Sequence, residues 1–197
     1  TGRLAAIAEL ELGVAAPSIS EAVSARILSS KKQERVSSSQ TYKKPEPKPT
    51  YLDIVDMKKA LLAAKISAYA QGFDILSAAN KEFDWDMNLA DIAKIWRAGC
   101  IIRARFLDEV ADAFTTETKL VNLIMAPHFS AILKDSIPSL RRTVKWAITR
   151  GIPSPVLSAS LSYFETYTSL NLPANLIQGQ RDYFGSHGFE RIDKPGY

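Results

Sequence analysis

The sequence predicts an all-α fold: a multi-helix domain built around a long central helix, followed by a short C-terminal tail. Apolar residues recur at spacings of three and four along most of the 197 residues, which is typical of helices that bury one face. Alternating apolar and polar runs, which half-buried strands require, are scarce. Capping residues, prolines and glycines separate the periodic segments, so we expect about nine or ten helices with short connections.

The N-terminal part predicts two helices and a linker. Residues 3–12 form the first helix, and Gly13 ends it because glycine tolerates the left-handed backbone. Ser18 and Glu21 have the spacing of a capping box, which predicts that the second helix begins there and runs to about residue 36, with a break near residue 30. Residues 37–50 are polar and rich in proline, so they are predicted to be an exposed linker.

The longest predicted helix covers about residues 52–82. Its main apolar side chains follow steps of 4, 3, 4 and 3, at Leu62, Ile66, Tyr69, Phe73 and Leu76. The same stripe would suit a coiled-coil seam. However, it covers only two heptads and its flanks are rich in alanine, which favours the buried central helix of a bundle.

The second half of the chain predicts a series of shorter helices. Asn88 is a good N-cap for a helix that is interrupted near Gly99 and resumes to about residue 114. The remaining helices are expected at about residues 119–125, 128–136, 139–150 (ended by Gly151) and 155–170.

Charge, cysteine content and hydropathy exclude several classes of protein for this chain. The net charge of +4 suits an anionic small molecule but lacks the dense basic stripe of a nucleic-acid binder. A lone Cys100 excludes an internal disulfide framework and indicates a reducing compartment. No apolar run reaches the length of a membrane span, so we expect a cytoplasmic protein without a membrane or nucleic-acid partner.

The chain contains no motif that would carry chemistry by itself. Its glycines form neither G-x-G-x-x-G nor a phosphate-binding loop, its two histidines and Cys100 lack metal-ligand spacing, and no serine or cysteine nucleophile has a recognisable base. We therefore predict no catalytic residue and no metal site in this chain.

The stretch LPANLIQGQRDYFGSH, residues 172–187, is the most informative segment. It predicts a helix that Pro173 begins and Gly185 ends by taking a positive φ, with Arg181 in its last turn. His187 follows two residues later, so a guanidinium and an imidazole flank a chain reversal and form a candidate anion-binding pair. Taken alone, the pattern is explained better by a surface arginine and a solvated histidine.

Together with WRAGCIIR (96–103), YAQGF (69–73), GIPSP (151–155), EAVSAR (21–26) and the initial TGR, this stretch resembles the helical domain of 6-phosphogluconate dehydrogenase. The resemblance spans nearly the whole chain. Local departures include Leu4, where the family usually has tryptophan, and Gly179, where it usually has alanine.

The resemblance implies an enzyme that oxidises C3 of 6-phosphogluconate and passes a hydride to NADP. The β-keto acid then loses CO₂ and gives ribulose 5-phosphate, a step of the pentose phosphate pathway. It also implies that NADP is bound mainly by an N-terminal Rossmann domain, which this chain does not contain. We therefore expect an inactive fragment, with a helical domain over residues 1–184 and a tail over 185–197.

The resemblance further implies four substrate-binding residues. Arg26 and Arg181 would grip the phosphate through their guanidinium groups, Thr1 would donate a hydroxyl hydrogen bond to it, and His187 would bind the substrate from the tail. In the family the tail enters the partner subunit of a homodimer. Without the resemblance, we would expect Arg26 to pair with Glu21 on the helix surface.

Two other classes remain open from the residues alone. The chain would also suit a non-catalytic helical dimerisation module, or the helical domain of a related hydroxyacid or imine dehydrogenase that lacks a phosphate site. The paired arginines and the tail stretch argue against both. We interpret Arg97, Arg103 and Arg105 as structural, with Arg105 pairing to Asp108 or Glu109.

Overall fold

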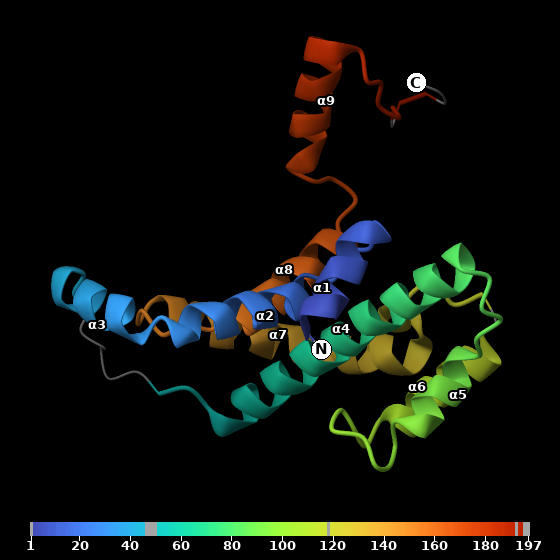
Figure 1. Cartoon of the computed structure of the whole chain (residues 1–197), viewed down its shortest axis with the longest axis horizontal. Coiled ribbons are helices and arrows are strands. Elements are labelled where there is room, and N and C mark those ends of the chain that lie inside the picture. The colour runs from blue at the N-terminus through green and yellow to red at the C-terminus, as the bar shows by residue number, and fades with distance from the viewer. Residues whose placement is uncertain (1, 46–50, 118, 192, 195–197) are drawn as a thin grey trace. The chain divides into compact units, whose positions relative to one another are not determined.

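The computed structural model describes residues 2–45, 51–117, 119–191 and 193–194. Within these ranges the chain forms nine α-helices and one short 3₁₀ helix, and it contains no strand, as the sequence predicts (Figure 1). The chain divides into two compact units, Thr1–Tyr163 and Phe164–Tyr197, each with its own internal contacts. No helix among the described residues is long and apolar enough to cross a membrane.

Two long helices, α4 (Ile54–Glu82) and α7 (Pro127–Ile148), pack against each other at the centre of the first unit. The core between them contains large, fully buried side chains, including Ile66, Phe73, Phe129, Leu133 and Leu140. The prediction of a buried central helix is confirmed. Leu62, Tyr69 and Leu76 of the expected stripe are only half-buried. The reason is that the alanine face of α4 (Ala60, Ala63, Ala64 and Ala70) is buried as well.

Helices α1 (Gly2–Glu11) and α2 (Pro17–Ser30) pack as a hairpin, and α2 also contacts α4. Gly13 has a φ of +64°, so its predicted role as the stop after α1 is confirmed. The predicted capping box is wrong, because α2 begins at Pro17, which suits the first helical position. Ser18 is therefore inside the first turn, where it is buried and bonds to other helices.

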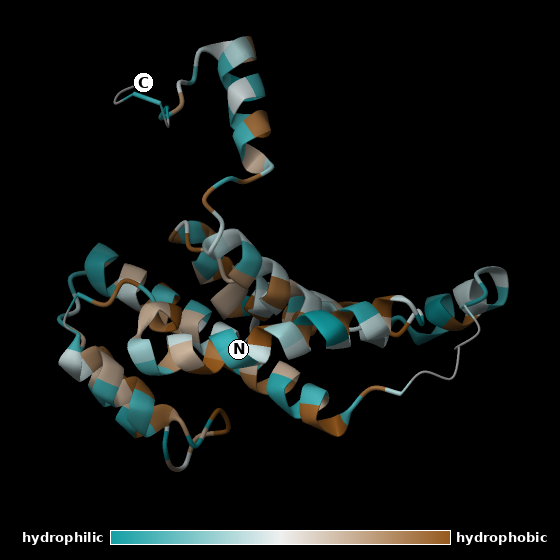
Figure 2. Cartoon of the chain, turned by 180° about the vertical axis from the view of Figure 1, so that it is seen from behind, coloured by the Kyte–Doolittle hydropathy of each residue, from teal (hydrophilic) through white to brown (hydrophobic). Residues whose placement is uncertain are grey.

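Helix α3 (Lys32–Thr41) follows a break at Lys31, as predicted. Residues 37–41, which we expected in the linker, are helical instead, and the Ser39 hydroxyl donates to the carbonyl of Val36 within that helix. The helix has no buried residue and is largely hydrophilic in Figure 2. Of the expected linker, residues 46–50 lie outside the described residues.

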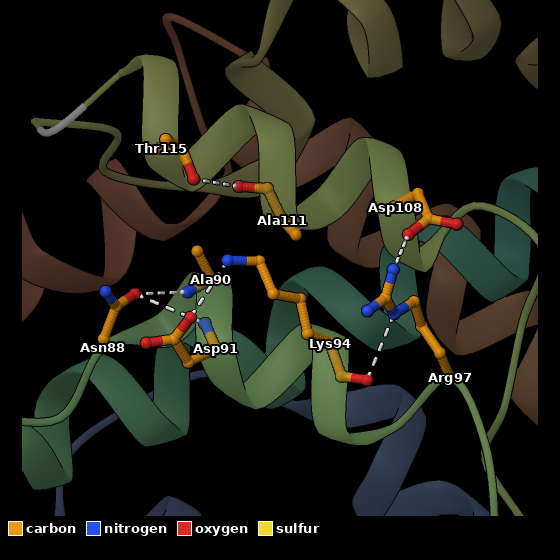
Figure 3. A network of polar contacts seen from close by, with 8 residues as sticks. All are labelled: Asn88, Ala90, Asp91, Lys94, Arg97, Asp108, Ala111 and Thr115. Atoms are coloured by element: carbon orange, nitrogen blue, oxygen red, sulfur yellow. Dashed lines mark hydrogen bonds and ion pairs between the residues drawn. The ribbon is translucent and has the colours of Figure 1, made fainter.

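Helix α5 (Leu89–Ile95) begins as predicted, because the Asn88 side chain accepts hydrogen bonds from the N–H groups of Ala90 and Asp91. The predicted interruption is longer than expected, since α6 (Leu107–Thr116) begins well after Gly99. Across this gap Arg97 pairs with Asp108 at 2.5 Å (Figure 3). Asp108 therefore binds Arg97 and not Arg105, which we had expected to pair with Asp108 or Glu109.

The single helix α7 replaces the two helices that we predicted around Pro138. Proline cannot donate to the carbonyl four residues earlier, which belongs to Lys134. Both Pro138 and Lys134 are exposed, so solvent can bind that carbonyl and the helix continues. Short helix η1 (Leu123–Met125) precedes α7, and α8 (Pro155–Tyr167) follows it.

Candidate functional site: an arginine groove and a histidine tail

A groove of about 830 Å³ lies in the first unit and contains the predicted ligand Arg26. Helices α1, α2, α4 and α8 all contribute to its lining, which includes Arg3, Val23, Arg26, Ile27, Ala68 and Val156. The groove therefore combines apolar walls with two guanidinium groups. Such a mixture suits a small anion that carries a carbon skeleton.

Arg26 lies on α2 and its side chain is exposed. Its guanidinium makes no hydrogen bond or ion pair with any residue that the structure describes, and the alternative pairing with Glu21 is absent from the described contacts. All of its donors are thus available to a ligand, and a guanidinium can meet two phosphate oxygens at once. Thr1, the other ligand predicted in this unit, lies outside the described residues.

Arg3 is a groove residue that sequence reasoning missed. It lies in the first turn of α1, lines the same groove as Arg26, and has no hydrogen-bond or ion-pair partner among the described residues. The initial TGR segment contained the signal, but only its threonine was assigned a role. Two unpaired cations in one hollow attract an anion more strongly than either does alone.

Buried hydrogen bonds hold α2 against the core. The Gln71 side chain of α4 accepts from the Ser18 N–H at 2.8 Å, and its amide group donates to the Ser18 hydroxyl at 2.9 Å. The same hydroxyl lies 2.9 Å from that of Ser160 on α8. All three residues are at most 2% exposed, so these bonds fix the helix that carries Arg26.

The second unit contains α9 (Ala174–Gly185), which carries Arg181 on its exposed surface. Arg181 also lacks a hydrogen-bond or ion-pair partner among the described residues. The predicted helix is confirmed, but the predicted reason for its end is wrong. Ser186, not Gly185, takes the left-handed backbone, with a φ of +50°.

Gly185 is required for a different reason, which concerns His187. A Cβ atom at Gly185 would lie 2.7 Å from Nε2 of His187, so the imidazole occupies the space that any other side chain would fill. The next residue is clamped to α9: Asp182 accepts from the Gly188 N–H at 2.7 Å, and Gln178 donates to the Gly188 carbonyl at 2.8 Å. The tail is thus folded back so that His187 has a defined place.

His187 lines a hollow of about 1000 Å³ with Gln178, Gly188 and Arg191, whereas Arg181 does not line it. The structure therefore brings Arg3 and Arg26 together in the first unit, and it places Arg181 and His187 on the second. Among the described residues, no cluster of three or more histidine, cysteine or acidic side chains could hold a metal ion.

Comparisons with known proteins agree with this arrangement. The family model described as "6-phosphogluconate dehydrogenase, C-terminal domain" matches residues 1–197. The decarboxylating 6-phosphogluconate dehydrogenase of Escherichia coli K12 is 44% identical over 199 residues, which cover 100% of this chain and 42% of that protein. The Klebsiella pneumoniae enzyme of the same name is 45% identical over 199 residues, with the same coverage.

A solved structure is also similar along nearly the whole chain. A Plasmodium falciparum 6-phosphogluconate dehydrogenase, described in its apo form and in complexes with NADP+ and 6-phosphogluconate, superimposes with a TM-score of 0.91 at 40% identity. The match covers 98% of this chain and 43% of that one. The chain spans about two fifths of the length of the curated relatives it matches. Because the family model matches residues 1–197, this chain belongs to the family of 6-phosphogluconate dehydrogenase C-terminal domains.

Proposed function

We propose that this chain is the substrate-anchoring helical part of a decarboxylating 6-phosphogluconate dehydrogenase. The whole enzyme would convert 6-phospho-D-gluconate to D-ribulose 5-phosphate and CO₂ with reduction of NADP in the cytoplasm. The observation that carries the proposal is the groove in which Arg3 and Arg26 lie without acidic partners, in a chain that matches this family from end to end.

In this proposal the groove binds the phosphate end of the substrate. Arg26 donates from its guanidinium fork to the phosphate oxygens, and Arg3 adds a second positive charge beside it. Thr1 is proposed to donate a hydroxyl hydrogen bond to the same group. Because the phosphate is remote from C3, its binding energy serves to orient the sugar chain, so loss of an arginine affects turnover as well as affinity.

NADP accepts the hydride in the proposed reaction, but the described residues of this chain do not fit a dinucleotide site. They form helices and turns and include no strand–glycine turn–helix unit, whose backbone N–H groups bind a pyrophosphate. We therefore assign NADP binding to a Rossmann domain outside these 197 residues, and we assign the proton-transferring groups to that part as well.

We further propose that the second unit serves the neighbouring subunit of a homodimer. Arg181 would complete the partner's phosphate site, and His187 would bind the same substrate. Two features support this role. Arg181 has no partner among the described residues, and α9 has no buried residue although Leu176, Ile177 and Phe184 are large and apolar.

The phosphate assignment is tested with Arg26→Ala in the enzyme that contains this chain. We expect a large rise in KM for 6-phosphogluconate and little change in any rate measured with gluconate, which lacks the phosphate. The matched control is Arg35→Ala, which removes an exposed arginine from α3, outside the groove. Equal losses with both substrates would contradict phosphate binding by Arg26.

The exchange of the tail is tested by mixing two variants, each of which is expected to be nearly inactive at a 6-phosphogluconate concentration well below its raised KM. Subunits with Arg26→Ala and subunits with Arg181→Ala are combined, and the hybrid dimers are separated and assayed. If each tail works in the partner's site, one site of each hybrid carries both substitutions and the other carries neither, so about half of the wild-type activity per dimer returns. Hybrids as inactive as the parents would contradict the proposal.

A further inference from the structure

A buried acid joins the two helices that carry the groove arginines. Glu9 is only 7% exposed and is the one buried residue among the described residues of α1. Its Oε1 accepts from the Ala16 N–H at 2.9 Å, and its Oε2 accepts from the Ser20 hydroxyl. Ala16 is the N-cap of α2 and has no side chain that could cap the helix. Glu9 therefore supplies the cap from the neighbouring helix, and its charge lies at the positive end of α2.

The other end of the hairpin is held by close packing. A Cβ atom at Gly2 would lie 3.0 Å from Cγ2 of Val23, so α1 approaches α2 there as closely as glycine permits. The two helices thus run antiparallel, with Glu9 bonded to the start of α2 and Gly2 packed against its middle. These two contacts hold α1 against α2 at both ends of the hairpin.

Arg3 and Arg26 project from the Gly2–Val23 end of this hairpin. Arg3 follows Gly2 directly, and Arg26 lies three residues after Val23, one turn further along α2. Their like charges repel each other, and neither has an acidic partner among the described residues. The distance between them depends on contacts elsewhere in the hairpin. Among the described residues, the hydrogen bonds of Glu9 are the side-chain hydrogen bonds that join α1 to the start of α2.

We propose that Glu9 is a positioning residue for the phosphate site: by bonding Ala16 and Ser20 it fixes α1 on α2 and thereby sets the spacing of Arg3 and Arg26. The inference rests on the proposed function of the groove. Glu9 itself does not line the groove, so its proposed role is to position the arginines and not to contact the substrate. Glu9 acts by fixing the position of α1 along α2. That position sets the distance between the two guanidinium groups that would bind the phosphate.

The test compares Glu9→Ala with Glu11→Ala, which removes an exposed carboxylate of the same helix, in the enzyme that contains this chain. For Glu9→Ala we expect KM for 6-phosphogluconate to rise about five- to tenfold, kcat to fall by a smaller factor, and the inhibition constant of inorganic phosphate to rise in parallel with KM. Any rate measured with gluconate should not change, because gluconate has no phosphate for Arg3 and Arg26 to bind. Glu9→Gln keeps one acceptor for the Ala16 N–H, so it should restore most of the affinity.

The outcomes separate this inference from the function on which it rests. If Arg26→Ala raises KM for 6-phosphogluconate and Glu9→Ala does not, Glu9 is a structural residue only and the inference is overturned. If Glu9→Ala lowers the rates with phosphorylated and unphosphorylated substrates alike, its effect is on folding, and the inference is also overturned. If Arg26→Ala has no effect on phosphate affinity, the proposed function itself fails.

Discussion

The carboxylate of Asp74 accepts a hydrogen bond of 2.6 Å from the side-chain amide of Asn122, in a largely buried cluster that also includes the Tyr163 hydroxyl. Asn122 is 1% exposed and also caps η1 by accepting from the Ile124 N–H. The cluster ties α4 to η1 and α8. Burial raises the pKa of Asp74 to about 6, although the hydrogen bonds from Asn122 and Tyr163 oppose that shift.

This pKa predicts a pH dependence of folding. The unfolded carboxyl has a pKa of 3.8, so the stabilising effect of protonated Asp74 is complete below about pH 4 and is lost as the pH rises through 6. We expect the wild-type free energy of unfolding to fall by about 1–2 kcal/mol between pH 4 and pH 7.5 relative to Asp74→Asn, allowing for solvent screening. Urea titrations at both pH values measure the difference. Asp112→Asn, on an exposed acid, should leave the wild-type dependence intact.

The ion pair between Asp56 and Arg142 predicts an effect of opposite sign. Hydrogen bonds from Arg142 and then Ser139 hold the pKa of Asp56 at about 2, so this pair stabilises the fold above pH 4 and is lost as the pH falls through 2. Arg142→Ala should therefore move the midpoint of acid unfolding to a higher pH, as followed by circular dichroism. The comparison is Lys145→Ala, which removes an exposed cation of the same helix; an identical shift there would point to net charge instead.

Substitution by alanine is expected to have different effects at the two glycines of α9: a gain in helix stability at Gly179 and a displaced His187 at Gly185. Gly179 has open space where a Cβ would lie, so Gly179→Ala should stabilise the helix by about 0.5–1 kcal/mol. Gly185→Ala places its Cβ against the His187 ring and should displace it. Melting temperatures and the affinity for 6-phosphogluconate measure the two effects. Equal affinity in both variants would show that the position of His187 is unimportant for binding.

The hydrogen bonds of the Gln71 side chain to Ser18 are expected to contribute to the free energy of unfolding by holding α2 on α4. Gln71→Leu keeps the volume but leaves the buried Ser18 N–H without an acceptor, so we expect a loss of about 1–3 kcal/mol in the free energy of unfolding. Gln33→Leu, at an exposed position on α3, should change it by less than about 0.5 kcal/mol. Urea unfolding at pH 7 distinguishes the two. If Gln71→Leu costs no more than the small change expected for Gln33→Leu, the Ser18 N–H has found another acceptor.

Local signals predicted the helices wherever a single residue decides an end. Asn88 caps α5 with its own side chain, and Gly13 ends α1 with a positive φ. Errors arose where tertiary surroundings decide. Ser18 and Glu21 have capping spacing, but Pro17 begins the helix and Ser18 turns toward Gln71. Pro138 would break an isolated helix, yet it is tolerated on the solvent side of α7.

The candidate site shows the same division. Arg26, Arg181 and His187 were identified through the resemblance, because their chemical pattern alone did not distinguish them from surface cations. Arg3 became visible only when the fold brought α1 beside α2, since no spacing along the chain relates it to Arg26. Glu9 could not be predicted at all, because its partners depend on the turn between the two helices.

Helix α9 has twelve residues, and none of them is buried. Isolated helices of this length are marginal in water, so contacts with a partner would add to the stability of this helix. If it completes a neighbour's site as proposed, each site exists only while two subunits remain associated, and specific activity must fall on dilution below the dissociation constant. Because the substrate would bind only to the associated dimer, an excess of 6-phosphogluconate would oppose that fall in activity. The activity of a dilute enzyme would therefore depend most strongly on the substrate concentration.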